Sequence, residues 1–402
     1  MRTLDLTENG DSLVESLDGD VAALLAASRL VAVEPYGVET FRLIPGLRVG
    51  ALRIAHGDDL IEVRVSPKVG IARLLFLLGY AVDPGWRDED VEVEEADALL
   101  PAVLDALSRA AGRALAPGVL QGYRVVDDAL PLVRGRMLPG AQMARRFALP
   151  LPVEVRYDEY DADIAENQIL LAACRLGLTI PRLRAATQSR LLHAVGRLDG
   201  VSLLRAGTSR PVWRPSRINA RYVGALRLAE LVLDHLSIER TGGSTNLTSA
   251  GLVVPMWKVF EDFVTKALAE AMADQPGVAH SQFPVNLDVG GLVPMKPDLV
   301  HVRYGRPVLV VDAKYKAESL DGYPNADAYQ LLAYCTALRL PSGHLIYAKG
   351  NETARDYDIC FSPVVIRAHA LDLGGSPAQL LARLASLAQE LLRSSYPRVP
   401  TA

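Results

Sequence analysis

Residues 295–300 (MKPDLV), 304–307 (YGRP) and 308–314 (VLVVDAK) decide the fold of the C-terminal part of this chain. Two runs of β-branched and apolar residues flank a turn that contains Gly, and this pattern predicts a β-hairpin. Side chains alternate between the two faces of a strand, so Asp312 and Lys314 share one face with alternate valines of the last run. Two charges therefore extend a face that is otherwise apolar.

A carboxylate and an ammonium at the end of a buried face cost desolvation energy unless they are paired or hold a metal. With Asp298 on the neighbouring strand, two carboxylates could chelate Mg²⁺. Lys314 could then orient or help to deprotonate an attacking water, as phosphodiester hydrolysis requires. The alternative is that Asp298, Asp312 and Lys314 are ordinary strand-end charges that form a salt bridge.

Two predicted helices add polar side chains to this group. The first spans residues 255–273, and Glu261 falls on the side of its apolar stripe. That stripe consists of Trp257, Phe260, Val264, Leu268 and Ala271. A carboxylate at this position needs a buried partner, which a metal site beside Asp298 and Asp312 would provide. The second helix, residues 327–334, carries Gln330, whose alternative role is a polar side chain satisfied within the core.

The order of a helix with Glu, a strand with Asp, a strand with Asp-x-Lys and a helix with Gln resembles the PD-(D/E)xK nuclease superfamily. More narrowly, the chain resembles McrC, the nuclease subunit family of the McrBC modification-dependent restriction systems. The similar segments are WKVFEDFV (257–264), PMKPD (294–298), VVDAKYK (310–316), YQLLAY (329–334) and GHLIY (343–347), with VRGR (133–136), YDE (157–159) and NQIL (167–170) upstream. The resemblance covers residues 74–374, most of the chain.

The resemblance implies a nuclease triad of Asp298, Asp312 and Lys314, with Glu261 and Gln330 as auxiliary residues. We expect Asp298, Asp312 and the backbone carbonyl of Ala313 to bind Mg²⁺ and Lys314 to act on the water. McrC-like proteins act with McrB, an AAA+ GTPase that recognises methylated cytosine. The resemblance therefore implies a McrB-like AAA+ GTPase and methylcytosine-containing DNA as partners.

The expected fold class is a multidomain α+β protein with three parts. Residues 1–69 are predicted to form a small α+β module, whose role in partner or DNA recognition the sequence leaves open. Residues 70–241 are predicted to form a mostly helical, partner-binding middle domain. Residues 242–402 are predicted to form an α/β PD-(D/E)xK nuclease domain with a mixed central sheet.

Local patterns predict most elements of the first two parts. The predicted strands span residues 41–44, 51–54 and 60–65. The predicted helices span residues 10–29 (as one or two helices), 71–81, 101–115, 162–176 and 181–198. Residues 239–245 (ERTGGST) are predicted to be a flexible junction before the nuclease domain.

Two groups of charged residues in the middle domain allow more than one interpretation. The acidic group Asp158, Glu159, Asp161, Asp163 and Glu166 precedes a predicted helix, where helix capping explains it better than a metal site. Candidate contacts to DNA phosphates or to the partner are Arg134, Arg136, Arg214, Arg217 and Arg221. The alternative for these arginines is a solvated, Arg-rich surface.

Composition limits the class of protein. A net charge of −4 is unusual for a free-standing DNA-binding protein, so a local basic surface or a partner must supply affinity for phosphates. Lysine is rare, at seven of the 43 basic residues, which makes Lys314 more informative. The three cysteines lie far apart, which argues against a disulfide framework or a zinc site and fits a reducing cytoplasm.

Absent motifs also guide the prediction. The longest apolar run, residues 74–82, is too short to span a bilayer, and residues 1–20 lack a signal-peptide pattern, so we expect a cytoplasmic protein without membrane contact. The sequence contains neither a P-loop nor a Gly-x-Ser-x-Gly elbow, so an energy-driven motor would be another chain.

The expected function is that of a Mg²⁺-dependent DNA endonuclease subunit that stimulates an AAA+ GTPase. Two alternatives remain open. One is a partner-independent nuclease that acts in DNA repair, and the other is a non-catalytic adaptor that binds and stimulates the motor. Three polar groups on a buried face argue against the adaptor, because a scaffold does not need them.

Overall fold

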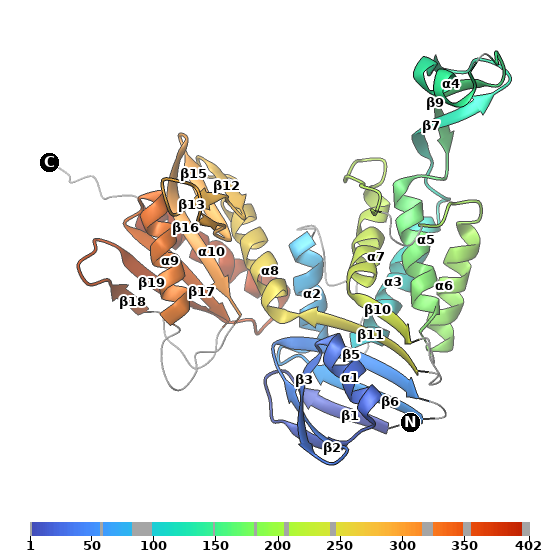
Figure 1. Ribbon diagram of the computed structural model, residues 1–402. Coiled ribbons are helices and arrows are strands. Elements are labelled where there is room, and N and C mark those ends of the chain that lie inside the picture. The colour runs from blue at the N-terminus through green and yellow to red at the C-terminus, as the bar shows by residue number, and fades with distance from the viewer. Residues whose placement is uncertain are drawn as a thin grey trace. The chain divides into compact units, whose positions relative to one another are not determined.

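The computed structural model describes residues 2–56, 59–82, 99–147, 149–180, 183–204, 209–241, 247–315, 325–348 and 355–395. These residues form a mixed α/β protein with several sheets and ten α-helices (Figure 1). The chain divides into two compact units. The first unit contains residues 1–100 and 237–402, and the second unit contains residues 101–236.

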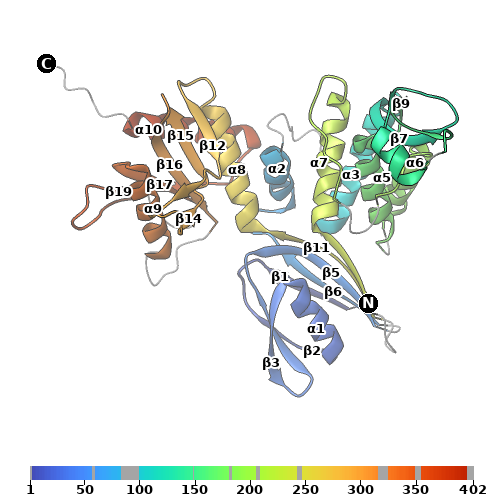
Figure 2. The same ribbon diagram turned by 45° about the horizontal axis from the view of Figure 1, so that its top comes forward.

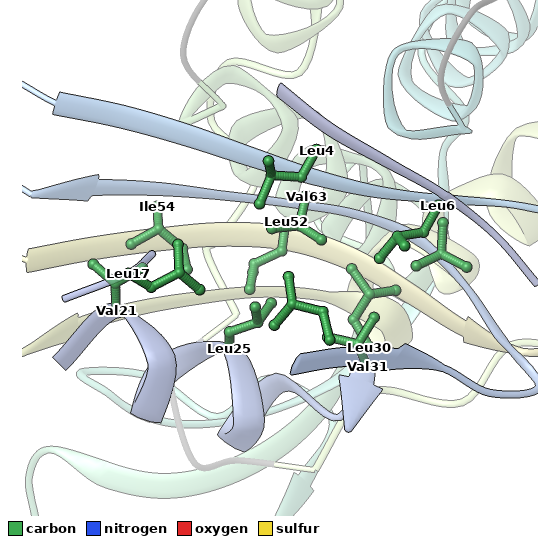
Figure 3. Close-up of a cluster of buried hydrophobic side chains, with 12 residues drawn as sticks. Leu4, Leu6, Leu17, Val21, Leu25, Leu30, Val31, Leu52, Ile54 and Val63 are labelled. Carbon is green, nitrogen blue, oxygen red and sulfur yellow. The ribbon is translucent and has the colours of Figure 1, made fainter. Parts of the chain in front are cut away.

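The N-terminal part of the first unit is built on a five-stranded sheet. In spatial order its strands are β1 (Arg2–Thr7), β6 (Asp59–Ser66), β5 (Arg48–His56), β11 (Leu247–Pro255) and β10 (Leu236–Thr241). A three-stranded sheet of β2 (Leu13–Ser16), β4 (Thr40–Pro45) and β3 (Val31–Gly37), together with helix α1 (Gly19–Ser28), accompanies it. Leucine, isoleucine and valine side chains from α1 and from both sheets form one buried cluster (Figure 3). The strands predicted at residues 41–44, 51–54 and 60–65 are confirmed as β4, β5 and β6.

Two predictions for this region need correction. Residues 13–16 are not helical but form β2, whose Leu13 pairs with Leu43. The helix begins only after Asp18, whose side chain accepts a hydrogen bond from the N–H of Asp20 as an N-cap. The apolar spacing of residues 14–25 misled the prediction because it spans two elements.

The boundary predicted at residues 241 and 242 also differs from the division seen in the structure. Strand β11 pairs antiparallel with β5 over its full length and completes the N-terminal sheet. Residues 239–241 of the predicted junction lie in β10, and residues 242–246 lie outside the described residues. This pairing joins residues about 200 positions apart, so a local sequence pattern cannot reveal it.

A six-stranded mixed sheet forms the C-terminal part of the first unit. Its order is β12 (Val278–Ser281), β15 (Leu299–Arg303), β16 (Arg306–Lys314), β17 (Ser342–Ala348), β19 (Val365–Leu371) and β18 (Arg355–Asp358). The predicted hairpin is confirmed, because β15 and β16 pair antiparallel. Its two turn residues have positive φ, 51° at Tyr304 and 72° at Gly305, as the twist of a tight hairpin requires. A short ribbon of β13 (Val285–Asn286) and β14 (Pro294–Met295) precedes β15.

Helices cover both faces of this sheet. Helix α9 (Asn325–Leu338) packs on one face, where Leu331 and Tyr334 join a buried cluster with Val310 of β16. Helices α8 (Met256–Ala271) and α10 (Pro377–Ser395) contact β16 and each other. Helix α2 (Ile71–Val82) lies beside α8 (Figure 2), and the rings of Phe76 and Tyr80 pack edge-on against Phe263.

The second unit combines helices with a sheet that the sequence did not predict. Its helices are α3 (Leu99–Leu115), α5 (Ala165–Leu178), α6 (Ala185–Arg197), the 3₁₀ turn η2 (Ala220–Tyr222) and α7 (Val223–His235). Strands β7 (Gly122–Leu130), β9 (Val153–Asp161) and β8 (Arg136–Met137), with helix α4 (Pro139–Arg145), form an arm over residues 122–161. In Figure 1 the arm extends beyond the ends of helices α5 and α6.

The predicted capping role of the acidic group is wrong for most of its members. Asp158, Glu159 and Asp161 lie on β9, not at a helix start. Arg124 of β7 pairs with Glu159 and Asp161 across the ribbon. Only Glu166 lies in the first turn of α5, and it does not cap that helix. Glu159 and Asp161 therefore pair two strands, and Glu166 alone is placed to complement the dipole of α5.

None of the helices in the described residues is both long and apolar enough to cross a bilayer.

Gly343 allows α9 to approach β17 closely. A Cβ at this position would lie 2.6 Å from the Cys335 sulfur and 2.7 Å from Cγ of Leu331. We therefore expect Gly343→Ala to lower the free energy of unfolding by about 1–3 kcal/mol through overpacking. Urea unfolding of the purified chain measures this change.

Gly19→Ala is the matched control, because a Cβ there meets no atom within 4 Å. It should change the unfolding free energy by less than about 0.5 kcal/mol, as exposed substitutions usually do. Equal midpoints for Gly343→Ala and the wild type would show that α9 does not pack closely on β17.

Candidate active site at the ends of strands β15 and β16

Three of the predicted site residues come together where two neighbouring strands meet. Lys314 Nζ lies 2.7 Å from Oδ2 of Asp312, and both residues are at the end of β16. Asp298 directly precedes β15, and its Oδ2 accepts a hydrogen bond of 2.9 Å from the N–H of Ala313. The exposed fractions are 6% for Asp298 and 2% for Asp312. The hairpin thus places two carboxylates and one ammonium together in a buried position.

The electrostatics of this group show an excess of negative charge. Burial and the nearby charge of Asp298 raise the pKa of Asp312 from its usual 3.8 to about 7, although Lys314 opposes the rise. Burial lowers the pKa of Lys314, but Asp312, Asp298 and Asp327 together raise it above its ordinary value. Lys314 is therefore an ammonium at neutral pH, and one cation faces several carboxylates.

Helix α8 brings another carboxylate to the same place. Glu261 is half-buried, and its pKa is raised to about 7 by burial, then by the charge of Asp298 and, more weakly, by that of Asp312. The predicted stripe of α8 is wrong at Trp257, which is 42% exposed. The buried side is centred on Phe260 and Phe263, so the helix is rotated slightly from the predicted orientation.

Gln330 of α9 reaches the group through a tyrosine. Its Nε2 donates a hydrogen bond of 2.7 Å to the hydroxyl of Tyr334, which in turn lies 3.5 Å from the carbonyl oxygen of Lys296. Burial raises the pKa of Tyr334 to about 12, and the charge of Asp312 adds to this effect. Gln330 itself is exposed, so it is not a polar residue satisfied within the core.

Two residues beside the site escaped the sequence analysis. Gln282 donates a hydrogen bond of 2.9 Å from Nε2 to Oδ1 of Asp298, so both oxygens of this carboxylate have partners. Asp327 is 5% exposed, and its charge acts on Asp312 and Lys314. Asp327 lies three residues before Gln330 on the predicted helix, so the sequence already indicated that the two side chains lie on the same face. No local pattern indicated Gln282.

The donors of this group suit Mg²⁺ better than a soft metal. In the described part of the chain, no set of three or more His, Cys, Asp or Glu side chains is arranged to hold a metal ion. Mg²⁺ is usually bound through one or two carboxylates, with waters and substrate phosphates as the other ligands. Asp298, Asp312 and the Ala313 carbonyl match this donor set. Two buried carboxylates that share one ammonium leave an excess of negative charge, which favours a bound cation here.

The five predicted arginines lie in the second unit and differ in their contacts. Arg134 lies over the ring of Tyr157, 4.1 Å from its centroid. Arg221 donates to the carbonyl oxygens of Ala114 (2.7 Å) and Gly118 (2.9 Å), so it closes the C-terminal end of α3. The remaining three, Arg136, Arg214 and Arg217, are exposed. Arg221 therefore supports the fold of its own unit.

A pair of buried histidines lies elsewhere in the same sheet. Nδ1 of His344 in β17 lies 3.0 Å from Nε2 of His369 in β19. Burial, together with the charges of His369 and Arg367, lowers the pKa of His344 to about 3. Burial also lowers the pKa of His369. Both rings are therefore neutral at pH 7, and one donates its N–H to the other.

The fold and the site define a multidomain α/β protein that buries an acid–lysine group at the strand ends of a mixed sheet. The chain belongs to the family described as McrBC 5-methylcytosine restriction system component, whose model matches residues 46–348.

One solved structure shares the fold of this chain. The chain resembles a chain of the refined half-complex from the tetradecameric assembly of Thermococcus gammatolerans McrB AAA+ hexamers with bound McrC. The TM-score is 0.60 at 17% identity, with 98% of this chain and 100% of the other covered. A chain of the cryo-EM structure of the Thermococcus gammatolerans McrBC complex gives a TM-score of 0.44 at 17% identity, covering 68% and 89% of the two chains. No curated protein matches the sequence.

The histidine pair predicts how stability depends on pH. The unfolded chain takes up a proton on His344 near pH 6.5, whereas the folded chain does so only near pH 3. The unfolded state therefore binds more protons between these values, so stability falls as the pH is lowered through this window. We expect this residue to contribute a slope of about 1 kcal/mol per pH unit near pH 5.

Urea unfolding between pH 7.5 and pH 5 measures this slope, with His344→Gln as the test variant because glutamine keeps a hydrogen-bonding group but does not titrate. The variant should lose less stability than the wild type as the pH falls. The exposed His280 provides the control His280→Gln, which should follow the wild type. Parallel curves for His344→Gln and the wild type would contradict the prediction.

Proposed function

We propose that this chain is the Mg²⁺-dependent DNA endonuclease subunit of a McrBC-like, modification-dependent restriction system. The observation that carries the proposal is the buried group of Asp298, Asp312 and Lys314, with Glu261 beside it. Burying this much charge costs desolvation energy, and buried charged groups of this kind cluster at functional sites. The mixed sheet and the order of its polar residues support assignment of the C-terminal part to the PD-(D/E)xK nucleases.

Each residue would have a separate task in phosphodiester hydrolysis. Asp298, Asp312 and the Ala313 carbonyl would bind Mg²⁺, which would neutralise phosphoryl oxygens and activate a water. The Lys314 ammonium would orient that water and stabilise negative charge on the phosphate. Glu261 would accept a proton at its carboxylate, and Gln330 would hold Tyr334 against the chain just before Asp298. Gln282 and the Ala313 N–H would fix the orientation of Asp298.

The arm of the second unit supports a partner-binding role. Its exposed apolar side chains include Tyr123, Val125, Met143, Phe147, Leu149 and Tyr160. An exposed group of large apolar side chains is typical of a protein–protein interface. The related structure contains McrB AAA+ hexamers with bound McrC, so we assign the arm to a McrB-like AAA+ GTPase. This partner would supply recognition of methylcytosine and the motor activity.

Two other functions are compatible with the same chain. A partner-independent repair nuclease would cleave DNA alone, at a rate that no GTPase changes. A non-catalytic adaptor would stimulate the GTPase, and substitutions at the acid–lysine group would not change its function. The exposed apolar arm argues against the partner-independent nuclease, because it indicates a protein partner. The buried polar group argues against the non-catalytic adaptor, because it indicates a catalytic role.

The proposal predicts that Asp312→Ala abolishes DNA cleavage. The assay compares methylated and unmethylated plasmid with Mg²⁺, with and without the partner GTPase and GTP. The wild type should cut methylated DNA only with the partner, and Asp312→Ala should lower the rate by about a hundredfold or more, because a metal ligand is lost. Stimulation of GTP hydrolysis should persist in this variant.

Asp262→Ala is the control, because Asp262 is an exposed carboxylate on α8 that pairs with Lys258. It should cut at the wild-type rate. Cleavage by Asp312→Ala at the wild-type rate would refute the assignment, and cleavage by the lone wild-type chain would support the repair nuclease.

A second prediction concerns the arm. Phe147 is 81% exposed and Met143 is 67% exposed, so replacing both with Glu should leave the fold intact. Charges in an apolar interface should weaken binding to the GTPase by about a hundredfold, since two anchors are lost. Sedimentation of the mixed proteins and the rate of GTP hydrolysis measure this loss. Phe361→Glu, at a residue 110% exposed in the first unit, is the control and should bind normally.

A further inference from the structure

A buried glutamate of the N-terminal part contacts the strand that carries the proposed nuclease site. Leu4, Leu6 and Glu8 alternate at the start of the chain, and all three are buried. Leu4 and Leu6 point into the cluster drawn in Figure 3. Glu8 follows the last residue of β1, where the N–H of Glu8 still donates to the carbonyl of Ser66 (3.0 Å). A carboxylate on this buried side costs desolvation energy, so its contacts require an explanation.

Glu8 joins three segments through one oxygen. Its Oε2 accepts a hydrogen bond of 3.1 Å from the hydroxyl of Tyr315 and one of 3.2 Å from the backbone N–H of Lys68. Burial raises the pKa of Glu8, although both hydrogen bonds and the charge of Lys68 oppose the rise. The exposed fraction of Glu8 is 1% and that of Tyr315 is 8%, so water competes little for this hydrogen bond.

Tyr315 in turn touches two parts of the site. It directly follows Lys314 in the sequence, so its position fixes the backbone at the end of β16. Its ring packs against Phe260 with 5.7 Å between centroids, and Phe260 directly precedes Glu261. A shift of Tyr315 would therefore move Lys314 through the backbone and Glu261 through the ring contact.

Packing alone does not hold the polar end of Tyr315. A cavity of about 380 Å³ borders this junction, with Glu8, Lys68, Tyr315 and Asp372 in its wall. Close-packed neighbours would fix the ring without help, but a cavity leaves room for it to move. The hydrogen bond to Glu8 is then the interaction that sets the position of the hydroxyl.

We infer that Glu8 is a positioning residue for the proposed nuclease, acting through the Tyr315 hydroxyl to hold the end of β16 and the Phe260–Glu261 turn of α8 in place. This inference rests on the proposed function and gives the N-terminal part a role in the reaction. A displacement of about one ångström at a reacting group can lower a rate by about a hundredfold, so one hydrogen bond can matter for catalysis.

The test uses the full chain with the partner GTPase, GTP, Mg²⁺ and methylated plasmid. Tyr315→Phe removes only the hydroxyl, whereas Glu8→Leu removes the carboxylate that accepts from both Tyr315 and the Lys68 N–H. Both should lower kcat about tenfold with little change in KM, because the substrate-binding surface is unchanged. The double variant should be no worse than Glu8→Leu alone, since Tyr315→Phe breaks a hydrogen bond that Glu8→Leu has already removed. Glu8→Gln keeps an acceptor oxygen and should restore most of the wild-type kcat.

A second measurement does not depend on cleavage. Hydrogen exchange of the amides at the end of β16 should be faster in Tyr315→Phe and Glu8→Leu than in the wild type, and unchanged in Glu8→Gln. Glu34→Gln, at an exposed residue of the same part, is the control and should match the wild type in both assays. If Glu8→Leu does not fold, Tyr315→Phe still tests the inference, because Phe keeps the ring.

The outcomes separate this inference from the proposed function. Wild-type values of kcat and exchange in Tyr315→Phe, with cleavage by the wild type, would overturn the inference and keep the nuclease. No cleavage by the wild type under any condition would overturn the nuclease, and the exchange data alone would then decide whether Glu8 and Tyr315 position the strand.

Discussion

The ion pair of Asp312 and Lys314 at the end of β16 is the constraint on which the rest of the first unit depends. Burying two charges costs desolvation energy, and their attraction alone does not offset this cost. Other polar groups must satisfy the remaining hydrogen-bonding capacity of the pair. Asp298 directly precedes the hairpin partner β15, Glu261 comes from α8 and Tyr334 comes from α9. The sheet and the helices on its two faces therefore hold these polar groups together in a buried position.

Local sequence patterns were sufficient for the hairpin and for the order of the polar residues around it. Alternation along the strand showed that Asp312 and Lys314 share a face, and the spacing of α8 showed that Glu261 lies near the buried side. The same reasoning failed at Trp257, where a small error in helix rotation exposes the side chain. It missed Gln282, because its contact with Asp298 depends on the path of the chain before β15.

Contacts between distant parts of the sequence account for most of what could not be predicted. Strand β11 completes the N-terminal sheet although it directly precedes α8, so the N-terminal part and the candidate site share one continuous segment. Residues 13–25 carry a helical spacing, yet pairing with β4 turns their first part into a strand. Glu8 is a similar case. Its buried carboxylate accepts a hydrogen bond from Tyr315, which lies far away in the sequence, so no local pattern explains the burial.

The two units carry different features that the proposed function requires. The buried acid–lysine group lies in the first unit, and the exposed apolar arm lies in the second. A chain with net charge −4 gains little from phosphate attraction, because DNA affinity depends mainly on neutralised phosphates. An active nuclease of this charge would need a local basic surface or a partner that holds the DNA more tightly. A dedicated apolar surface for a protein partner would meet this need, and under the proposed function it would also confine cleavage to DNA that the partner has already selected.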